Sequence, residues 1–581
     1  MQDQWKLQKY KILPRLRDLG IVGQLPGFQG NVPIQLKTIY GDSNITQQGA
    51  TGWMDSLDPL FEEIAKLWME TLIEDFGTMH WYQLDGYFNG GTAPWINGDI
   101  NDRGNTMISR SSLRGLQQIS RDDTWYRRGV AAYRSLSDTD PDAIWAFQGF
   151  SFVDWSSSEQ AGYLKGFIDS APQGRFVIID MSYGADGEWK KWDEASFFGA
   201  SFIWTTLHDF GGTDGIKGNV SQLTRIPFEA VDKSASIVGS GGTPEGLDQN
   251  PLYYEFLFEQ PFRATPVSNI TETFIRRSHQ RYRMKERDDN ISKAWDLLMD
   301  SLYATDRSVQ DLTGVAHLKP RDGVSLFESD GYTPTEMMCK VAGAWKHLLT
   351  AARTHGLEFI NEPFRYDLVN LGREVLAQLS TPAALNFTKS TEEYPIEKDE
   401  LLSSGQFYIS LLNDLDELVA TDDAFLLGPW LESARRWGVD SSDCYSSHYT
   451  YMATDCSCEC FYEWNARTQI TTWNPTNAAN QKIPSGPIDY AAKHWNGLIK
   501  DYYSKRASLL LAQAIEDQSR GHALNHTEVD RLFARHAYSW TRATNKYATE
   551  PVGDTLQLSL TMWEKYKGWF TTCKDPLVQT D

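Results

Sequence analysis

The sequence predicts a protein in two parts, an α/β part built on a parallel sheet followed by an all-α part. Up to about residue 260, short apolar runs rich in Ile, Val, Trp and Phe alternate with amphipathic segments. This alternation is typical of repeated βα units. Beyond residue 260 the strand signal disappears, and apolar residues recur at helical spacing instead. We therefore predict one domain over residues 1–260 and a second over residues 261–581.

Six apolar runs in the first part are the predicted strands. Their near-continuous apolar character suits a parallel sheet that is covered on both faces. Six strands fit either a doubly wound sheet or a (β/α)8 barrel that is two strands short. The predicted strands cover 20–28, 80–88, 143–152, 175–183, 201–210 and 236–241.

The clearest helix of the first part is predicted to begin after Asp58. Asp is a favoured N-cap residue, Pro59 follows at the first helical position, and Gly77 is placed to end the helix. Apolar residues at spacings of three and four predict the face that packs on the core. This face consists of Phe61, Ile64, Trp68 and Leu72.

The second part reads as a series of helices. One apolar stripe falls within 295–302 and another within 341–349. The segment 440–486 interrupts the helical pattern and contains four of the six cysteines. Further helices are predicted over 363–380, 397–421, 488–518, 526–544 and 555–570.

Composition excludes several classes of function. The chain has 55 Lys and Arg against 77 Asp and Glu, a net charge of −22, which argues against a nucleic-acid partner because such binding needs a basic face. No apolar run approaches the ~20 residues that a membrane span requires. The 21 Trp, 26 Tyr and 27 Phe are expected mostly in cores, but aromatic rings in a cleft also suit stacking on a sugar.

Cysteines and glycosylation sequons point to an oxidising compartment. Cys444, Cys456, Cys458 and Cys460 are clustered without the usual zinc-ligand spacing, so we expect at least one disulfide among them if the protein is secreted. Residues 1–7 do not resemble a signal peptide. Either the protein is cytosolic or this chain does not begin where its gene does. The Asn-x-Ser/Thr sequons begin at Asn44, Asn219, Asn269, Asn290, Asn386 and Asn525.

Polar residues that follow the predicted strands are the candidates for chemistry, because active sites on parallel sheets lie at the carboxyl ends of strands. Glu245 is the most suggestive, since its position between Pro244 and Gly246 holds it on a stiff, kinked backbone. The alternative is a loop carboxylate that caps the next helix. His208 and Asp209 could be a base and its orienter, but adjacent strand residues point to opposite faces and cannot form a dyad by themselves.

The motifs of other enzyme classes are absent from the sequence. There is no Gly-x-Ser-x-Gly elbow, no Gly-x-Gly-x-x-Gly opening a helix and no His-Glu-x-x-His. Carbohydrate chemistry remains, which needs two carboxylates at strand ends and aromatic walls.

Several collinear motifs resemble the lysosomal α-N-acetylglucosaminidase family, glycoside hydrolase family 89. The family has a small N-terminal α/β domain, a (β/α)8 barrel and an all-α C-terminal domain. The resemblance begins at the third barrel strand. It therefore implies an incomplete (β/α)8 TIM-type barrel of about six βα units, followed by an all-α domain, with the small domain and about two strands absent. The matching motifs lie at 24–33, 76–80, 202–212, 241–246, 364–368, 425–432 and 488–492.

The resemblance also implies a site. Glu245 matches the family's catalytic nucleophile, and no metal or organic cofactor is implied. Phe150 stands where the family usually has Trp, and the loop around His317 differs in length from the family. The positions that match substrate-binding residues are Asn89, Phe150, Leu207, His317, Trp473, Pro487 and Tyr490.

The general acid/base is where this chain departs from the family. Family members carry Asp-Thr-Phe-Asn-Glu after the fourth barrel strand, whereas this chain ends the same motif with Asn89 and Gly90. Glycine cannot donate a proton. Asp99 or Asp102 could approach from a shifted loop, and Asp85 matches the family's structural aspartate on the same strand.

The resemblance therefore implies a retaining exo-glycosidase-like protein that acts on glycans with terminal α-linked N-acetylglucosamine, of the heparan-sulfate type. A lysosomal or secreted location is implied with it. Two alternatives stay open: a catalytically inactive glycan-binding relative, and an incomplete gene model of a whole enzyme. The sequence also leaves a homo-oligomer open.

Overall fold

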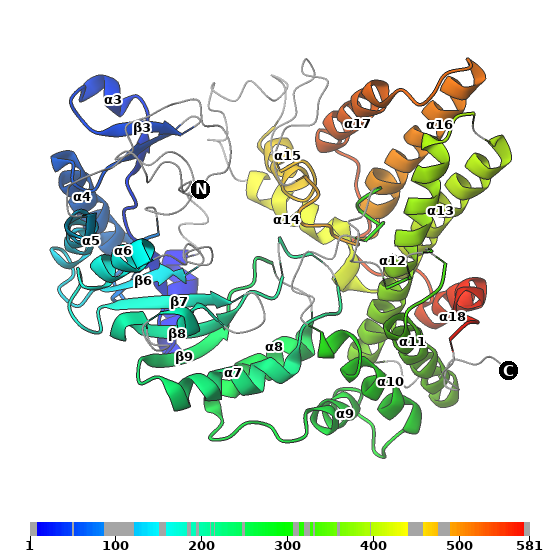
Figure 1. Cartoon of the computed structure of the whole chain (residues 1–581), viewed down its shortest axis with the longest axis horizontal. Coiled ribbons are helices and arrows are strands. Elements are labelled where there is room, and N and C mark those ends of the chain that lie inside the picture. The colour runs from blue at the N-terminus through cyan, green and yellow to red at the C-terminus, as the bar shows by residue number, and fades with distance from the viewer. Residues whose placement is uncertain are drawn as a thin grey trace. The chain divides into compact units, whose positions relative to one another are not determined.

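A computed structural model of the chain divides into two compact units (Figure 1). The first, which we call the α/β unit, comprises Met1–Leu207, Thr224–Thr243 and Leu257–Pro266. The second, which we call the helical unit, comprises His208–Leu223, Pro244–Phe256 and Val267–Asp581. The predicted domain bounds, 1–260 and 261–581, remain a prediction. The structure describes residues 8–48, 51–85, 121–149, 158–182, 187–192, 197–209, 211–213, 215–246, 250–305, 313–318, 326–328, 330, 332–356, 361–395, 397–439, 457–473 and 488–573.

The α/β unit contains a six-stranded parallel sheet, and each predicted strand falls on one of its strands. The sheet order is β1-β5-β6-β7-β8-β9, so each strand pairs with the next parallel strand along the chain. Within the described residues β1 and β9 do not pair with each other, so the sheet is an incomplete barrel rather than a closed one. The strands are β1 (Gln24–Pro26), β5 (Trp81–Gln83), β6 (Ile144–Gln148), β7 (Phe176–Ser182), β8 (Ser201–Thr206) and β9 (Ile237–Gly242).

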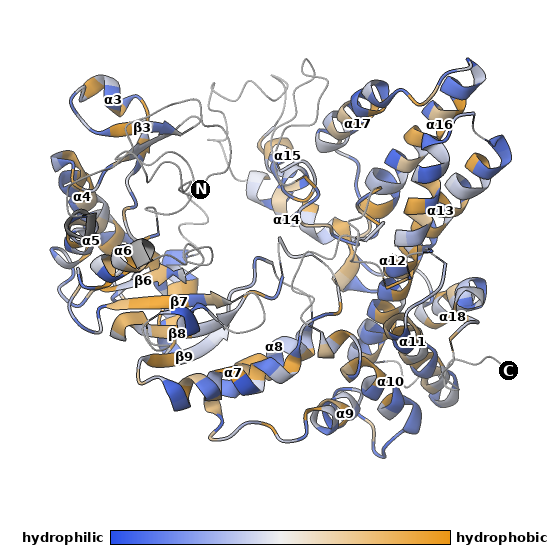
Figure 2. Ribbon diagram, viewed as in Figure 1, coloured by the Kyte–Doolittle hydropathy of each residue, from blue (hydrophilic) through white to orange (hydrophobic). Residues whose placement is uncertain are grey.

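Aromatic side chains fill the space between this sheet and its helices. Trp145 on β6 lies with its ring centroid 4.8 Å from that of Phe176 on β7 and 5.2 Å from that of Phe167. Figure 2 shows β7 as hydrophobic along most of its length. The near-continuous apolar pattern of the strands thus reflects their burial. The later helices of this βα series are α5 (Arg121–Ser137), α6 (Ser158–Ile168), α7 (Val220–Lys233) and α8 (Pro251–Glu259).

The helix predicted after Asp58 is confirmed as α4 (Pro59–Phe76), but its predicted packing face is partly wrong. The Asp58 carboxylate accepts a hydrogen bond from the Leu60 amide, and Gly77 ends the helix with a φ of 70°. Trp68 is 43% exposed, and Ile64 is only half-buried. The buried face consists of Phe61, Ala65, Met69, Leu72 and Phe76.

A small antiparallel sheet explains why the buried face of α4 differs from the predicted one. It contains β2 (Asn31–Pro33), β3 (Ile45–Gln48) and β4 (Thr51–Met54) in the order β2-β4-β3. Its buried residues form one core cluster with Phe61 and Ala65, which draws that face of α4 inward. The sequence did not reveal this sheet, because strands of three or four residues are too short to show a clear alternation.

The helical unit confirms the predicted all-α character. The helix α12 continues past the predicted end at residue 380, through Pro382, and most of its residues are buried. The prediction of a helix from residue 488 is wrong for its first turns, because Asp489 and Ala492 have φ values of 55° and 39°. The π-helix η10 (Ile499–Ser504) begins only later. The α-helices are α9 (Ile270–Arg281), α10 (Asp289–Met299), α11 (Glu336–His355), α12 (Glu362–Glu392), α13 (Lys398–Val419), α14 (Leu427–Val439), α15 (Cys458–Gln469), α16 (Lys505–Ser519), α17 (His526–Thr541) and α18 (Thr555–Tyr566).

Disulfides hold parts of the helical unit together. Cys339 on α11 is bonded to Cys573, which lies 234 residues further along the chain. Cys458 and Cys460 are also disulfide-bonded, which confirms the expectation of at least one disulfide within the cluster. Cys444 and Cys456 lie outside the described residues.

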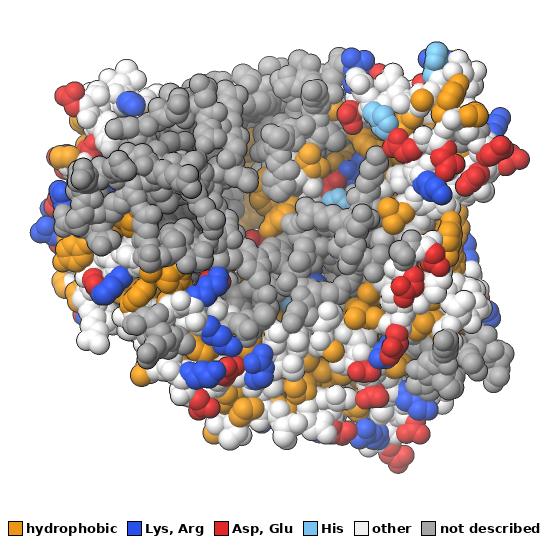
Figure 3. Space-filling model, viewed as in Figure 1, with side chains coloured by type: hydrophobic (Ala, Val, Ile, Leu, Met, Phe, Trp, Pro, Cys, Tyr) orange, Lys and Arg blue, Asp and Glu red, His pale blue; other side chains and the backbone are white. Residues whose placement is uncertain are grey.

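The surface is that of a mixed-charge protein. Figure 3 shows acidic and basic side chains interspersed with apolar and neutral ones on the visible face. Among the helices in the described ranges, none has the length and apolar character needed to cross a membrane.

Candidate active site

Glu245 lies three residues beyond the end of β9, in a turn that packs closely on the segment following β8. A Cβ atom on Gly246 would lie 2.3 Å from the Gly212 Cα, so only glycine permits this approach. Gly212 itself has a φ of 73°, a conformation that favours glycine. The Pro-Glu-Gly and Gly-Gly motifs are therefore two sides of one backbone contact within the helical unit.

The Glu245 carboxylate is held by two donors on the same oxygen. The Tyr490 hydroxyl donates to Oε2 at 2.6 Å, and the Gly211 amide donates to Oε2 at 2.7 Å. Two donors on one oxygen hold the carboxylate in one orientation. The described bonds do not run to the N-terminus of α8, so the geometry favours a functional group over a helix cap.

Asp209 fixes the backbone of the same turn. Its Oδ1 accepts hydrogen bonds from the amides of Glu245 at 2.8 Å and Gly246 at 3.2 Å. The side chain is fully buried, and burial raises the pKa of Asp209, an effect that these amides and the nearby Lys217 oppose. Asp209 thus orients Glu245 through the main chain.

His208 has partners of its own and does not form a dyad with Asp209. Its Nε2 accepts a hydrogen bond from the side-chain amide of Asn250 at 2.8 Å. Its ring stacks on that of Tyr253, with the ring centroids 3.8 Å apart. Burial, together with the charge of Lys217, holds the pKa of His208 well below its usual value. We therefore assign His208 as a neutral packing residue.

Trp473 and Tyr490 supply an aromatic corner beside Glu245. Their ring centroids are 5.8 Å apart in an edge-to-face arrangement. Trp473 is 46% exposed, although large aromatic side chains are usually buried. An exposed indole next to a carboxylate suits stacking on a sugar ring.

The other predicted site residues are placed less completely. Leu207 is buried directly after β8, and His317 is half-buried in the segment 313–318. Neither is described in contact with Glu245. The predicted positions outside the described residues are Asn89, Gly90, Phe150 and Pro487.

Asp85 has the contacts of a structural residue. It is buried, and its carboxylate accepts hydrogen bonds from the Gln148 amide at 3.0 Å and from the Gln83 side chain. Burial raises the pKa of Asp85. These contacts link the ends of β5 and β6, as expected for a structural aspartate. Asp99 and Asp102 lie outside the described residues.

Sequence reasoning missed two groups that hold Glu245. The Gly211 amide donates to its carboxylate, and Asp209 binds its backbone rather than orienting His208. The Gly-Gly pair after β8 could have indicated the Gly211 amide, because glycine lets a main-chain amide approach a ligand closely.

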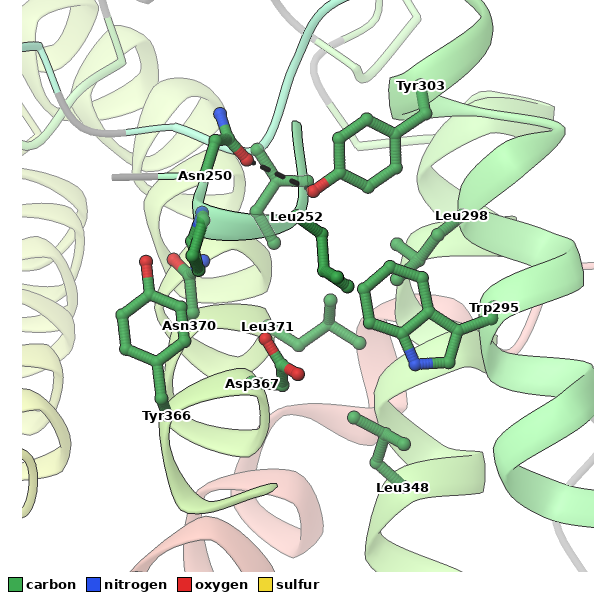
Figure 4. Close-up of a pocket in the computed structure, with 12 residues that line it drawn as sticks. Asn250, Leu252, Trp295, Leu298, Tyr303, Leu348, Tyr366, Asp367, Asn370 and Leu371 are labelled. Carbon is green, nitrogen blue, oxygen red and sulfur yellow. Dashed lines mark hydrogen bonds between the residues drawn. The ribbon is translucent and has the colours of Figure 1, made fainter. Parts of the chain in front are cut away.

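A small cavity in the helical unit is distinct from this corner (Figure 4). Asn250 lines it and accepts a hydrogen bond from the Tyr303 hydroxyl at 3.1 Å. Its volume of about 10 Å³ suits one water molecule, not a sugar. Glu245 is not among its lining residues. Across the described part of the chain, no group of three or more His, Cys, Asp or Glu side chains is arranged to hold a metal ion.

Comparisons with known proteins place both parts of the chain. Residues 1–264 match the family model of the alpha-N-acetylglucosaminidase (NAGLU) TIM-barrel domain, and residues 275–565 match that of the NAGLU C-terminal domain. Alpha-N-acetylglucosaminidase of Homo sapiens is 26% identical over 571 residues, which cover 96% of this chain and 68% of the human protein.

Solved structures with the same fold come from Clostridium perfringens. A family 89 glycoside hydrolase in complex with 2-acetamido-1,2-dideoxynojirimycin has a TM-score of 0.75 at 20% identity. The match covers 96% of this chain and 58% of the bacterial chain. A form with two glutamates replaced by glutamine, in complex with its substrate GlcNAc-α-1,4-galactose, also has a TM-score of 0.75 at 20% identity, with 95% and 57% of the two chains covered. This chain thus spans less than two thirds of these bacterial proteins.

Proposed function

Because the chain belongs to the α-N-acetylglucosaminidase family, glycoside hydrolase family 89, we propose that it cleaves terminal α-linked N-acetylglucosamine with retention of configuration. The observation that carries this proposal is the Glu245 carboxylate, bound on Oε2 by the Tyr490 hydroxyl and the Gly211 amide. A carboxylate held in this way is fixed in one orientation, as a nucleophile must be.

In this mechanism the second oxygen of Glu245 attacks C1 of the sugar. The bond from C1 to the leaving oxygen breaks, and its electron pair departs with the aglycone. Water then attacks C1 of the covalent glycosyl-enzyme and releases Glu245. Trp473 provides the exposed aromatic surface for the sugar, and Asp209 holds the nucleophile's backbone throughout.

The weak point of this mechanism is the proton for the leaving group. A retaining glycosidase needs a second carboxyl group ~5–5.5 Å from the nucleophile, and Gly90 stands at the matching position. Loss of general acid–base catalysis typically lowers the rate by ~10²–10⁴-fold. We therefore propose that the chain hydrolyses natural glycosides weakly. For the same reason, a glycan-binding relative without turnover is the second candidate function.

The proposed substrates are glycans of the heparan-sulfate type, and the proposed location is lysosomal or secreted. Disulfide-bonded cysteines and exposed sequon residues such as Asn44, Asn269 and Asn525 support an oxidising, glycosylating route. The net charge of −22 opposes binding of a polyanion at neutral pH. Acid pH weakens this repulsion, because carboxylates become protonated.

Azide is the sharpest test, because this small anion attacks without needing a general base. With an aryl α-N-acetylglucosaminide, the unmodified chain should turn over faster with azide and form the α-glycosyl azide. Glu245→Gly should form the β-glycosyl azide instead, because azide then attacks in place of the nucleophile. Product anomers are read by proton NMR.

Glu245→Gln is the matched control, since it keeps the shape of the side chain and removes its charge. This variant should be inactive while it still binds the iminosugar 2-acetamido-1,2-dideoxynojirimycin weakly. Gly90→Glu should raise activity on the natural linkage more than on the aryl glycoside. Equal cleavage of both glycosides by the unmodified chain would show that another residue donates the proton.

A further inference from the structure

A buried arginine joins the two segments that carry Tyr490 and His317. On the function proposed above, we propose that Arg506 of α16 is a positioning residue, which sets the place of the Tyr490 hydroxyl on the nucleophile and of His317 beside the substrate. The guanidinium is not described in contact with Glu245 itself. Arg506 acts instead through the residues that directly precede Tyr490 and His317.

The two contacts of the Arg506 guanidinium are short and point in different directions along the chain. Nη1 donates to the Asp489 carboxylate at 2.6 Å, and Nη2 donates to the Ala316 carbonyl at 2.8 Å. Asp489 directly precedes Tyr490, and Ala316 directly precedes His317. One side chain therefore holds segments that are more than 170 residues apart.

The surroundings fix the guanidinium as firmly as its partners do. Arg506 is buried, and its guanidinium carbon lies 4.8 Å from the Tyr502 ring centroid and 5.1 Å from that of Tyr503. Burial alone would lower the pKa of Arg506, but Asp489 and Tyr502 raise it above its usual value. The charge is therefore permanent, and the aromatic contacts restrict its orientation.

The segment around Tyr490 needs such a support, because its backbone is not part of a helix or strand. Asp489 has a φ of 55°, which is strained for a residue other than glycine. Its other contacts include the Asp489 amide bonded to the Thr471 carbonyl at 2.7 Å and the Thr213 hydroxyl bonded to the Tyr490 carbonyl at 3.2 Å. Release of Asp489 would let the Tyr490 hydroxyl drift from Glu245.

The segment 313–318 depends on Arg506 in a similar way. The Gly314 carbonyl accepts a hydrogen bond from Tyr408, and the Gly314 amide donates to Thr381. Both contacts fix the start of the segment, whereas Arg506 binds its far end next to His317. Loss of the guanidinium should therefore free the end that carries His317.

Arg506→Lys separates positioning from charge, because an ammonium keeps the positive charge but lacks the planar fork. Tyr490 donates to Glu245, so displacing it should remove one of the two donors that orient the nucleophile. The kcat for the aryl glycoside should fall while its KM changes little, as in Tyr490→Phe. A misplacement of this kind should lower kcat/KM by roughly ten- to a hundredfold. Combined with Tyr490→Phe, the loss should be less than the product of the two.

Two measurements keep this test independent of turnover. Binding of 2-acetamido-1,2-dideoxynojirimycin, followed by calorimetry, reports whether Arg506→Lys and Tyr490→Phe change the site in the same way. Hydrogen exchange of peptides covering 313–318 and 488–492 should speed up together in Arg506→Lys. The matched control is Arg435→Lys, a buried arginine of the same unit that pairs with Glu463.

The outcomes separate the two proposals. If the unmodified chain neither cleaves the aryl glycoside nor binds the iminosugar, the proposed function fails, and the exchange experiment still decides whether Arg506 holds both segments. If the unmodified chain is active but Arg506→Lys leaves kcat for the aryl glycoside unchanged, Arg506 does not position Tyr490. Exchange that rises equally in Arg435→Lys would reduce Arg506 to a general packing role.

Discussion

One buried carboxylate in each compact unit illustrates two ways of satisfying such a group. In the α/β unit, Asp180 on β7 accepts hydrogen bonds from the amides of Glu188 and Trp189. In the helical unit, Glu463 accepts from the guanidinium groups of Arg435 and Arg467. Loops at strand ends have free backbone amides, whereas amides inside helices are already bonded, so Glu463 is bound by charged side chains. Asp416 on α13 accepts the amides of Gly497 and Lys500 instead, because these lie at the start of a helical segment.

This contrast has an exception that helps to define it. Asp55 in the α/β unit pairs with Arg128 on α5, with both side chains buried. The pair joins the small antiparallel sheet region to a helix, and Asp55 Oδ1 also accepts the Leu57 amide at 3.1 Å. The type of element that surrounds the carboxylate, rather than the unit, decides which donor it receives.

The largest expected effect comes from removing the charge shared by two arginines. Glu463→Gln should destabilise the helical unit by about 3–5 kcal/mol, because it leaves Arg467 buried without a counter-charge and Arg435 with Glu432 alone. Hydrogen exchange of peptides from α14 and α15 measures the change. Asp180→Asn should cost clearly less at pH 5, because burial raises the pKa of Asp180 to about 7, so the group is neutral there and its removal leaves no buried charge unpaired. Equal costs would show that the type of donor does not matter.

The disulfide between Cys339 and Cys573 lies within the helical unit, and its removal tests whether the two units unfold separately. Replacing both cysteines by serine should destabilise the helical unit by about 2–5 kcal/mol, since the bond closes a long loop in the unfolded chain. Urea unfolding of the variant and of the unmodified protein gives the difference. Hydrogen exchange within the six-stranded sheet should stay unchanged. Faster exchange there would mean that the two units unfold as one.

Protonation should act on the two units with opposite sign. Burial raises the pKa of Asp180 to about 7, and burial lowers the pKa of His536 to about 4. The contribution of Asp180 to the free energy of unfolding is complete below its ordinary pKa of 3.8 and is lost as pH rises through about 7. The contribution of His536 is complete above its ordinary pKa of 6.5 and is lost as pH falls through about 4. These contributions amount to roughly 4 kcal/mol for Asp180 and roughly 3 kcal/mol for His536.

Single substitutions remove these dependences one at a time. His536→Gln should flatten the loss of stability between pH 6.5 and 4 in peptides from α17. Asp180→Asn should flatten the loss between pH 4 and 7 in peptides from β7. Hydrogen exchange at a series of pH values, corrected for the intrinsic rate, gives both slopes. A slope that survives its substitution would assign the titration to another group.

The smallest effects should come from two helix caps. Asp58 caps α4 in the α/β unit and Asp554 caps α18 in the helical unit, each by accepting a backbone amide at 2.9 Å. Asp554→Ala should cost about 1 kcal/mol. Asp58→Ala should cost more, because its second oxygen also accepts the Asn44 amide at 2.6 Å. Urea midpoints of the two variants measure this, and equal costs would show that the contact with Asn44 contributes little.

The sequence by itself determined the local elements of this protein. The apolar runs predicted all six strands of the parallel sheet, and Asp58, Pro59 and Gly77 predicted the ends of α4. These signals are readable because a strand or a helix end depends on residues close together in the chain. The Pro-Glu-Gly motif indicated Glu245 for the same reason, since proline and glycine restrict or free the backbone where they stand.

Only the tertiary structure decided which distant groups meet. Nothing near Cys339 indicates Cys573, and nothing near Arg506 indicates Ala316 or Asp489. The buried face of α4 was likewise set by a sheet whose strands are too short to recognise. Such pairings depend on how whole elements pack, and a periodic pattern records that a residue is buried but not against what. The hydrogen bond from Tyr490 to Glu245 belongs to this class, because it joins residues 245 positions apart.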